Sequence, residues 1–339
     1  MLKVHRPYHE SDHVLNVAFN VLCGGRTLDD IELRRNDPAY LDALGTEMIP
    51  DPTTAGDFCR RFSQLDIERM QEAINAARLE VWRRQDAEFF EQTARIDVDG
   101  SFVATDAECK EGMGLSYKGI WGYHPLLVSL ANTREPLFIA NRSGNRPSAE
   151  GAAAYLDKAI ALCRKAGFSD ILLRGDTDFS QTRFLDGWDA DRVRFVFGYD
   201  AMKNLVTRAN GIDGAEFCEL ERRAHGTFVA AEQRRAKQPR IKEGIVRAKG
   251  YKNIRLRSED IAEFEYRPTA CRQTYRMVVL RKNLTVERGD TALFDDIRYF
   301  FYITNDREMP AEQVVFEANE RCDQENLIAQ LKHGVRALH

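Results

Sequence analysis

The chain has 339 residues, of which 43% are hydrophobic and 30% are charged, with a formal net charge of −4. This length allows two domains, or one large domain with an insertion, and the composition excludes bulk disorder. No stretch approaches the roughly 18 consecutive apolar residues of a membrane span, and residues 1–12 lack the apolar core of a signal peptide. Seven dispersed cysteines, without a Cys-x-x-Cys pair, are typical of reduced thiols rather than disulfides or a zinc site. We therefore expect a cytoplasmic protein with no membrane partner.

Residues 1–92 are predicted to form a helical N-terminal region for DNA binding and assembly. An apolar-periodic helix is expected at Ser11–Cys23 and a further short helix at Asp29–Leu44. Ile49–Gly56 is rich in turn residues, and Leu65–Gln92 has helical spacing with many charges.

From Ala94 the pattern changes to short apolar runs typical of strands. Three strands, a helix, a strand, a helix and a strand form the order of a ribonuclease-H-like core. We therefore predict the α/β (α+β) class, with the first part of this core at residues 93–200. The expected strands are Ala94–Asp99, Pro125–Ala131, Pro136–Arg142, Asp170–Leu173 and Arg192–Gly198, and the expected helix after the third of them is Ala149–Ala166.

Residues 201–306 are predicted to form a β-rich insertion in this core. Strand-like runs lie at Tyr275–Leu280 and Tyr299–Thr304. The last helix of the core is expected at Met309–Lys332, within residues 307–339.

The insertion contains a strongly basic block. Between Arg222 and Arg257 there are twelve Lys and Arg residues and only two acidic ones, Glu232 and Glu243, a net charge of +10. Such a block is the electrostatic footprint of a DNA-binding surface, although a solvated loop is an equal alternative for a charge run alone. The residues predicted to contact DNA are Arg234, Arg235, Lys237, Arg240, Lys242, Arg247 and Lys249.

Two acidic motifs each follow a predicted strand. Asp97 and Asp99 would share one face of the first strand, and Asp99 is preferred because it stands at the strand end before Gly100. Asp176 lies at the carboxyl end of a later strand, where α/β sheets place their ligands, with Asp178 as the second candidate. The structural alternatives are a turn carboxylate in the first motif and, in the second, a cap for a helix from Gln181 onward.

The third acidic residue, Glu325, lies on the predicted last helix. On that helix Arg321, Glu325 and Lys332 form one stripe, in which a carboxylate can bind metal while the cations hold a DNA backbone. An ordinary salt-bridged surface helix fits the same spacing. Carboxylates from two strand ends and one helix could converge on hard divalent cations, which serve phosphoryl transfer.

These motifs resemble those of the DDE transposases of bacterial insertion sequences, in the IS-four-like superfamily and its thirteen-eighty group. The chain departs from the family at Ala318, where a tyrosine is usual, and at Ser101, where many relatives have threonine. Family members also usually continue further after the last catalytic helix, so an element truncated at its C-terminus is one alternative. The resemblance covers most of the chain and rests on Asp97–Ser101, Asn141–Asn145, Leu172–Phe179 and the spacing of Arg321, Glu325 and Lys332.

The resemblance implies a transposase that cleaves DNA at element ends and transfers the 3′-hydroxyl strand to target DNA. It implies Asp99, Asp176 and Glu325 as catalytic residues and ligands of two Mg²⁺ ions, for which Mn²⁺ could substitute. One ion would activate water and then the 3′-hydroxyl, and the other would stabilise the leaving oxygen. Arg321 and Lys332 would contact DNA.

The implied partners are double-stranded DNA with terminal inverted repeats and target DNA. A homodimer would bind them in the bacterial cytoplasm, associated with the nucleoid. Two alternatives stay open: a hydrolysis-only nuclease on the same fold, and an inactive DNA-binding remnant of a transposase.

Overall fold

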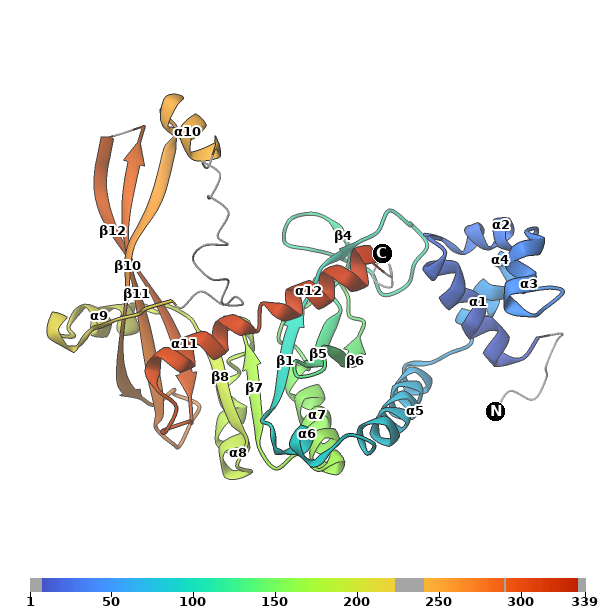
Figure 1. Cartoon of the computed structure of the whole chain (residues 1–339), viewed down its shortest axis with the longest axis horizontal. Helices are drawn as coiled ribbons and strands as arrows, with labels where there is room; N and C mark the ends of the chain where they lie inside the picture. The colour runs from blue at the N-terminus through green and yellow to red at the C-terminus, as the bar shows by residue number, and fades with distance from the viewer. Residues whose placement is uncertain (1–7, 223–240, 290, 335–339) are drawn as a thin grey trace, which may run out of the picture. The chain divides into compact units, whose positions relative to one another are not determined.

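The computed structural model describes residues 8–222, 241–289 and 291–334 (Figure 1). The chain divides into two compact units. Unit 1 consists of Met1–Ile171 and Arg321–His339, and unit 2 of Leu172–Glu320. No helix in the described ranges is long and apolar enough to cross a membrane.

The N-terminal segment of unit 1 is helical, as predicted. Its small core is formed by Ile31, Ile49 and Ala55, with Leu28 and Tyr40 packed against it. The helices are α1 (Glu10–Leu22), α2 (Ile31–Arg35), α3 (Pro38–Leu44), α4 (Pro52–Cys59), α5 (Gln64–Trp82) and α6 (Ala87–Glu91).

The prediction of a turn-rich segment at Ile49–Gly56 is wrong, because α4 begins inside it. Asp51 caps this helix by accepting a hydrogen bond from the Thr54 amide at 2.9 Å. Pro52 occupies the first helical position, where its missing N–H costs no hydrogen bond. The aspartate and proline that suggested a turn therefore mark a helix start.

The long helix expected at Leu65–Gln92 is two helices, α5 and α6. The second has its own N-terminal cap, because a side-chain oxygen of Asp86 accepts from the Phe89 amide at 3.1 Å. The charged residues between the helices gave no sign of this break.

Unit 1 contains a three-stranded antiparallel sheet in the order β6-β5-β1. Helix α7 (Ala152–Ala166) contacts all three strands and buries Leu156, Ala159 and Cys163. The strands are β1 (Ala94–Gly100), β5 (Leu126–Leu130) and β6 (Glu135–Ala140). A second small sheet, not predicted because its strands have only two or three residues each, is formed by β2 (Val103–Ala104), β4 (Trp121–Tyr123) and β3 (Gly114–Leu115).

Unit 2 is built on a mixed sheet in the order β7-β8-β12-β11-β10-β9. Strands β7 and β8 are parallel, and the other neighbours are antiparallel. The strands are β7 (Ile171–Gly175), β8 (Arg194–Tyr199), β9 (Cys218–Glu219), β10 (Lys252–Tyr266), β11 (Tyr275–Arg288) and β12 (Thr291–Thr304). The helices are α8 (Leu185–Ala190), α9 (Lys203–Asn210), α10 (Ile241–Ala248) and α11 (Ala311–Glu320).

The predicted fold class is confirmed. In chain order β1, β5, β6, α7, β7, α8 and β8 give the succession expected of a ribonuclease-H-like core. The insertion is β-rich, and β10, β11 and β12 extend well beyond the two short runs seen in the sequence. The roles assigned to the four segments 1–92, 93–200, 201–306 and 307–339 stay predictions.

The single last helix expected at Met309–Lys332 is wrong. The segment forms α11 and then α12 (Asp323–Ala329), followed by a π-helical turn at Gln330–Gly334. Helix α11 buries Val314 and Val315 in the core of unit 2, whereas α12 buries Gln324 and Ile328 in unit 1. The helix is interrupted because its two halves pack in different compact units.

Candidate active site

Asp99 lies at the end of β1, a strand that is covered on both faces. Ile96 and Val98 point to one face and are fully buried, and Asp97 on the other face is 1% exposed. Asp99 shares the face of Asp97, because side chains alternate along a strand, but it is only half-buried. Its Oδ1 accepts a hydrogen bond from the Gly100 amide at 2.7 Å. Asp99 is therefore the more accessible aspartate of the motif.

The Asn141–Asn145 segment packs against the small sheet that follows β1. The Gly144 amide donates to the carbonyl oxygen of Gly122 at 3.1 Å. A Cβ on Gly144 would lie 2.6 Å from the carbonyl oxygens of Gly114 and Gly122, so only glycine fits. This part of the family motif has a packing role.

Arg142 lies in the same segment, at a position where nothing in the sequence indicates a role. Its Nη1 donates to the carbonyl oxygens of Ser148 at 2.8 Å and Glu150 at 2.7 Å. Its Nη2 is buried and has no hydrogen-bond partner among the described residues, and burial lowers the pKa of the guanidinium. A Cβ built on Gly100 would lie 3.3 Å from Nη2. A partly buried cation therefore adjoins the residue that follows Asp99.

Helix α12 is docked on β1 and β5 through Gln324, which is 3% exposed (Figure 1). Its Nε2 donates to the carbonyl oxygens of Asp97 and Leu127, each at 3.1 Å. Ile328, one turn later, is also buried. Gln324 could not be singled out from the sequence, because an amide in a polar helix resembles a surface residue.

Glu325 is exposed, and it follows the residue that docks the helix. The predicted stripe is not one helical face, because Arg321 precedes the start of α12 and Lys332 lies in the π-helical turn. Arg321 is half-buried. Glu325 and Asp99 nevertheless belong to the same compact unit, and α12 contacts the strand that bears Asp99.

Lys332 is close enough to Asp99 for their charges to interact. Its Nζ donates to the carbonyl oxygen of Phe102 at 2.8 Å. Burial lowers the pKa of the Lys332 ammonium, and the negative charge of Asp99 partly opposes that shift. An ammonium has three donors, so this bond leaves capacity for an anionic ligand.

Asp176 lies at the carboxyl end of β7 in unit 2 and is half-buried. Its Oδ1 accepts from the Asp178 amide at 3.0 Å and caps the short 3₁₀ turn at Thr177–Phe179. Neighbouring β8 passes close to this backbone, because a Cβ on Gly198 would lie 2.9 Å from the Thr177 nitrogen. The cap is on this turn and not on a helix from Gln181 onward, which was the alternative to a catalytic role. The capping contact is compatible with a catalytic role of Asp176.

Arg174 and Glu317 form a buried ion pair two residues before Asp176. Arg174 Nη1 lies 2.9 Å from Glu317 Oε2, and the side chains are 2% and 3% exposed. Glu320, which is 45% exposed, lies 3.7 Å from the same nitrogen. The pair fixes α11 on β7, the strand that leads to Asp176.

The three predicted ligands are carried by different units, Asp99 and Glu325 by unit 1 and Asp176 by unit 2. Within residues 8–222, 241–289 and 291–334, no three or more His, Cys, Asp or Glu side chains are grouped to hold a metal ion. The donor set fits a hard divalent cation chemically, since all three side chains are carboxylates. Their role as ligands stays a hypothesis.

The predicted DNA-binding residues of the basic block are only partly described. Arg234, Arg235, Lys237 and Arg240 lie outside the described residues. Lys242 and Arg247 on α10, and Lys249 just after it, are all exposed. Helix α10 lies at one end of the long strands β10, β11 and β12 (Figure 1).

Comparisons with known proteins point to one family. The family model described as transposase DDE domain group 1 matches residues 3–338. No curated protein matches the chain. A solved structure described as a piggyBac transposase synaptic complex with hairpin DNA is similar, with 10% identity and a TM-score of 0.43 over 97% of this chain. The chain spans 61% of the length of that protein, and at this TM-score the likeness adds nothing to the assignment.

Proposed function

Because the chain belongs to the transposase DDE domain family, group 1, we propose that it cuts DNA at the ends of a mobile element and joins the freed 3′-hydroxyl groups to target DNA. Family membership supports a DNA transposase. The cleavage and strand-transfer steps are the finer part of the proposal.

The observation that carries the proposed site is the docking of α12 on β1. Gln324 binds the carbonyl oxygen of Asp97, two residues before Asp99, and Glu325 is the next residue of the same helix. This supports a shared function of Asp99 and Glu325, since one hydrogen bond links the two segments that carry them.

In this proposal Asp99, Asp176 and Glu325 hold divalent ions, Mg²⁺ or Mn²⁺. A bound ion supplies Lewis-acid stabilisation of charge on phosphoryl oxygens and lowers the pKa of water. Lys332 anchors the segment after β1 through Phe102 and directs its remaining donors to a phosphate. Arg321 contacts a second phosphate.

The proposed partners are double-stranded DNA with terminal inverted repeats and target DNA, bound by a homodimer in the bacterial cytoplasm and at the nucleoid. The exposed cations of the basic block supply affinity for the DNA backbone without sequence preference. Neutralising Lys242, Arg247 and Lys249 should reduce the slope of log affinity against log salt by about 0.9 for each lost phosphate contact. An unchanged slope would assign the block to a solvated loop.

The proposed site is tested with Asp99→Asn, Asp176→Asn and Glu325→Gln on a substrate that carries the terminal repeat, in Mg²⁺. Each change removes a ligand charge with little change of volume, so cleavage should fall by several orders of magnitude while DNA binding stays nearly intact. Asp97→Asn is the matched control and should be milder. Full cleavage by the Asp99 or Asp176 variant would overturn the assignment. Cleaved ends that are never joined to target DNA would instead favour a hydrolysis-only nuclease.

A further inference from the structure

The hairpin formed by β3 and β4 belongs to a small sheet that is anchored near Asp99. Strand β2 of this sheet begins at Val103 and pairs with β4. The residue before it is Phe102, whose carbonyl oxygen accepts the hydrogen bond from Lys332. Since Lys332 also interacts with the charge of Asp99, the small sheet is attached to the surroundings of the proposed site.

The tip of the hairpin is held in one conformation by hydrogen bonds. The Ser116 amide donates to the carbonyl oxygen of Ile120, and the Gly119 amide donates to that of Ser116, each at 2.9 Å. The Ile120 amide donates to Ser116 Oγ at 3.1 Å. Gly119 has a φ of +74°, a left-handed conformation that glycine adopts without strain. Tyr117 and Lys118 therefore occupy the two central positions of a fixed turn.

This turn presents an aromatic surface to solvent. Tyr117 is 94% exposed, and Lys118 Nζ lies 5.4 Å from the centre of its ring. Trp121, which pairs with Leu115 across the hairpin, is 56% exposed. Aromatic side chains have only two rotatable bonds, so they lose little conformational entropy when a ligand covers them. A fixed turn that carries such rings is well suited to binding a flat ligand.

A groove of about 630 Å³ borders the hairpin and limits what can lie on it. Ile120 and Trp121 line this groove together with the acidic residues Asp106 and Glu108. The two carboxylates repel a phosphate backbone, whereas Lys118 at the tip attracts one. A nucleic acid on this surface would therefore place bases on the aromatic side chains and a phosphate near Lys118.

A cut DNA end has the complementary surface. Inside a duplex each base pair is covered on both faces by its neighbours, whereas the last base pair of a cut end has one bare face. This face is flat, and the phosphates next to it are negatively charged. Aromatic side chains can cover it by stacking, which tolerates any base because every base has a π-face.

We propose that the β3–β4 hairpin binds the cut end of the element DNA, with Tyr117 and Trp121 stacked on the bare face of the terminal base pair and Lys118 on the nearest phosphate. The inference rests on the proposed function, since it takes as its ligand the DNA end that cleavage produces. It adds a binding step, in which the hairpin holds the freed end until that end is joined to target DNA. None of the proposed catalytic residues takes part.

The first test is the affinity of the full chain for two duplexes of equal length, without divalent ions so that neither is cut. One duplex ends in the terminal repeat, and the other carries the repeat at its centre. Tyr117→Ala should weaken binding of the first duplex by about 5- to 150-fold and of the second by less than about twofold.

Two further variants at the same position are the matched controls. Tyr117→Phe keeps the ring and should bind the first duplex as the wild type does. Tyr117→Leu keeps apolar area without the ring and should bind as weakly as Tyr117→Ala. A wild type without preference for the terminal repeat, an equal loss for both duplexes, or full binding by Tyr117→Leu overturns the proposal.

Trp121 provides a second test that does not depend on a change of affinity. The chain has three tryptophans, and Trp82 and Trp188 are only 3% and 4% exposed. Fluorescence that acrylamide can quench therefore comes mainly from Trp121. The duplex that ends in the terminal repeat should quench this fluorescence and protect it from acrylamide, and Trp121→Phe is the control that lacks the signal. An equal response to the duplex with the central repeat would contradict stacking on a DNA end.

The phosphate contact is tested through the salt dependence of binding. Lys118→Ala should reduce the slope of log affinity against log salt by about 0.9 for the duplex that ends in the repeat, and leave the slope for the other duplex unchanged. Lys165→Ala, at an exposed lysine of α7, is the matched control and should change neither slope. An unchanged slope in Lys118→Ala would remove Lys118 from the proposed contact.

Failure of this inference can be told apart from failure of the proposed function. The binding tests supply a DNA end that is already cut, so their outcome does not depend on which residues cut it. Failure of the proposed function would instead be full cleavage by the Asp99 or Asp176 variant, with binding of the cut end by the hairpin unchanged.

Discussion

The two halves of the last helical segment, α11 and α12, are held by different forces. Helix α11 buries Val314 and Val315 in an apolar core and adds the buried pair of Arg174 and Glu317. Helix α12 relies on the amide of Gln324 and on Ile328. An apolar core spreads its stabilisation over many contacts, whereas a hydrogen bond is lost as a whole when its donor is removed. The helix that carries Glu325 is therefore held by fewer contacts than α11.

The largest expected effect comes from the strongest contact of α11. Arg174→Met leaves the Glu317 carboxylate buried without the guanidinium that balances its charge, which should reduce the free energy of unfolding by about 3 to 5 kcal/mol. Urea unfolding measures the loss. The double variant Arg174→Met, Glu317→Leu should recover most of it, because no unpaired charge stays buried.

Glu320→Gln is the matched control for that pair. Glu320 lies 3.7 Å from Arg174 but is 45% exposed, so its removal should cost less than about 1 kcal/mol. If Glu320→Gln lowers the free energy of unfolding as much as Arg174→Met does, burial does not explain the contribution of the ion pair to stability.

A smaller effect is expected from overfilling the apolar cluster at Ala318. Ala318 packs in the same apolar cluster as Val314 and is 5% exposed, so a tyrosine side chain would exceed the space that the alanine fills. Ala318→Tyr should lower the free energy of unfolding by about 1 to 3 kcal/mol through overpacking. A tyrosine accepted without loss would show that the cluster can repack.

On the α12 side, Gln324→Ala removes the donor to Asp97 and Leu127. The expected loss is about 1 to 2 kcal/mol, concentrated in the α12 region rather than spread over the protein. Hydrogen exchange should accelerate in α12 and stay unchanged in α11. Gln330→Ala, at an exposed glutamine of the following turn, should change neither. Equal acceleration of hydrogen exchange in α11 and α12 would mean that the Gln324 hydrogen bonds do not stabilise α12 in particular.

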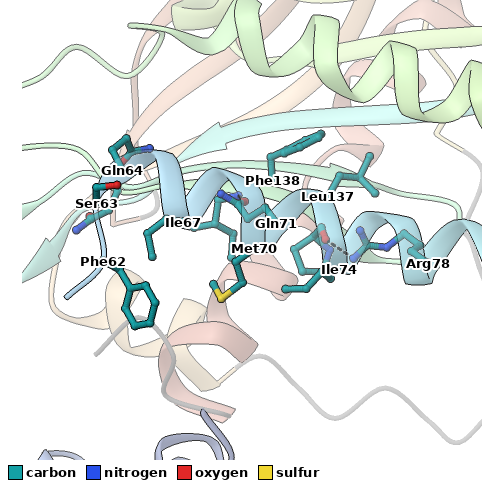
Figure 2. Close-up of a pocket in the computed structure, with 13 residues that line it drawn as sticks. Phe62, Ser63, Gln64, Ile67, Met70, Gln71, Ile74, Arg78, Leu137 and Phe138 are labelled. Carbon is teal, nitrogen blue, oxygen red and sulfur yellow. Dashed lines mark hydrogen bonds between the residues drawn. The ribbon is translucent and has the colours of Figure 1, made fainter. Parts of the chain in front are cut away.

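The sequence predicted the parts of this arrangement that have a periodic signal. The apolar runs located β1 and β7, and the strand ends located Asp99 and Asp176. The docking of α12 through a polar side chain has no such signal. Gln324 is a buried amide in a segment whose sequence is typical of a charged surface helix. The polar contacts of α5 with β6, made by Asn75 and by Arg78 (Figure 2), could not be predicted for the same reason. Neither the break before α12 nor the accessibility of Glu325 could be predicted, because both depend on which compact unit each half joins.

The smallest expected effect concerns the charge next to Asp99. Burial holds the pKa of Lys332 below its ordinary value of 10.5, and the Asp99 carboxylate opposes this shift. Asp99→Asn should therefore lower the pKa of Lys332 further, which NMR titration of the labelled lysine side chain measures.

A lysine whose pKa is lower in the folded protein destabilises the fold at pH values below that pKa. This destabilisation disappears as the pH rises to the pKa of the unfolded chain. Asp99→Asn should therefore also steepen the gain in stability over this alkaline range. Asp97→Asn is the control, because burial keeps Asp97 from the surface and its charge does not contribute to the shift. An unchanged pKa in Asp99→Asn would mean that the ammonium does not sense Asp99, and Lys332 would then have no place in the proposed site.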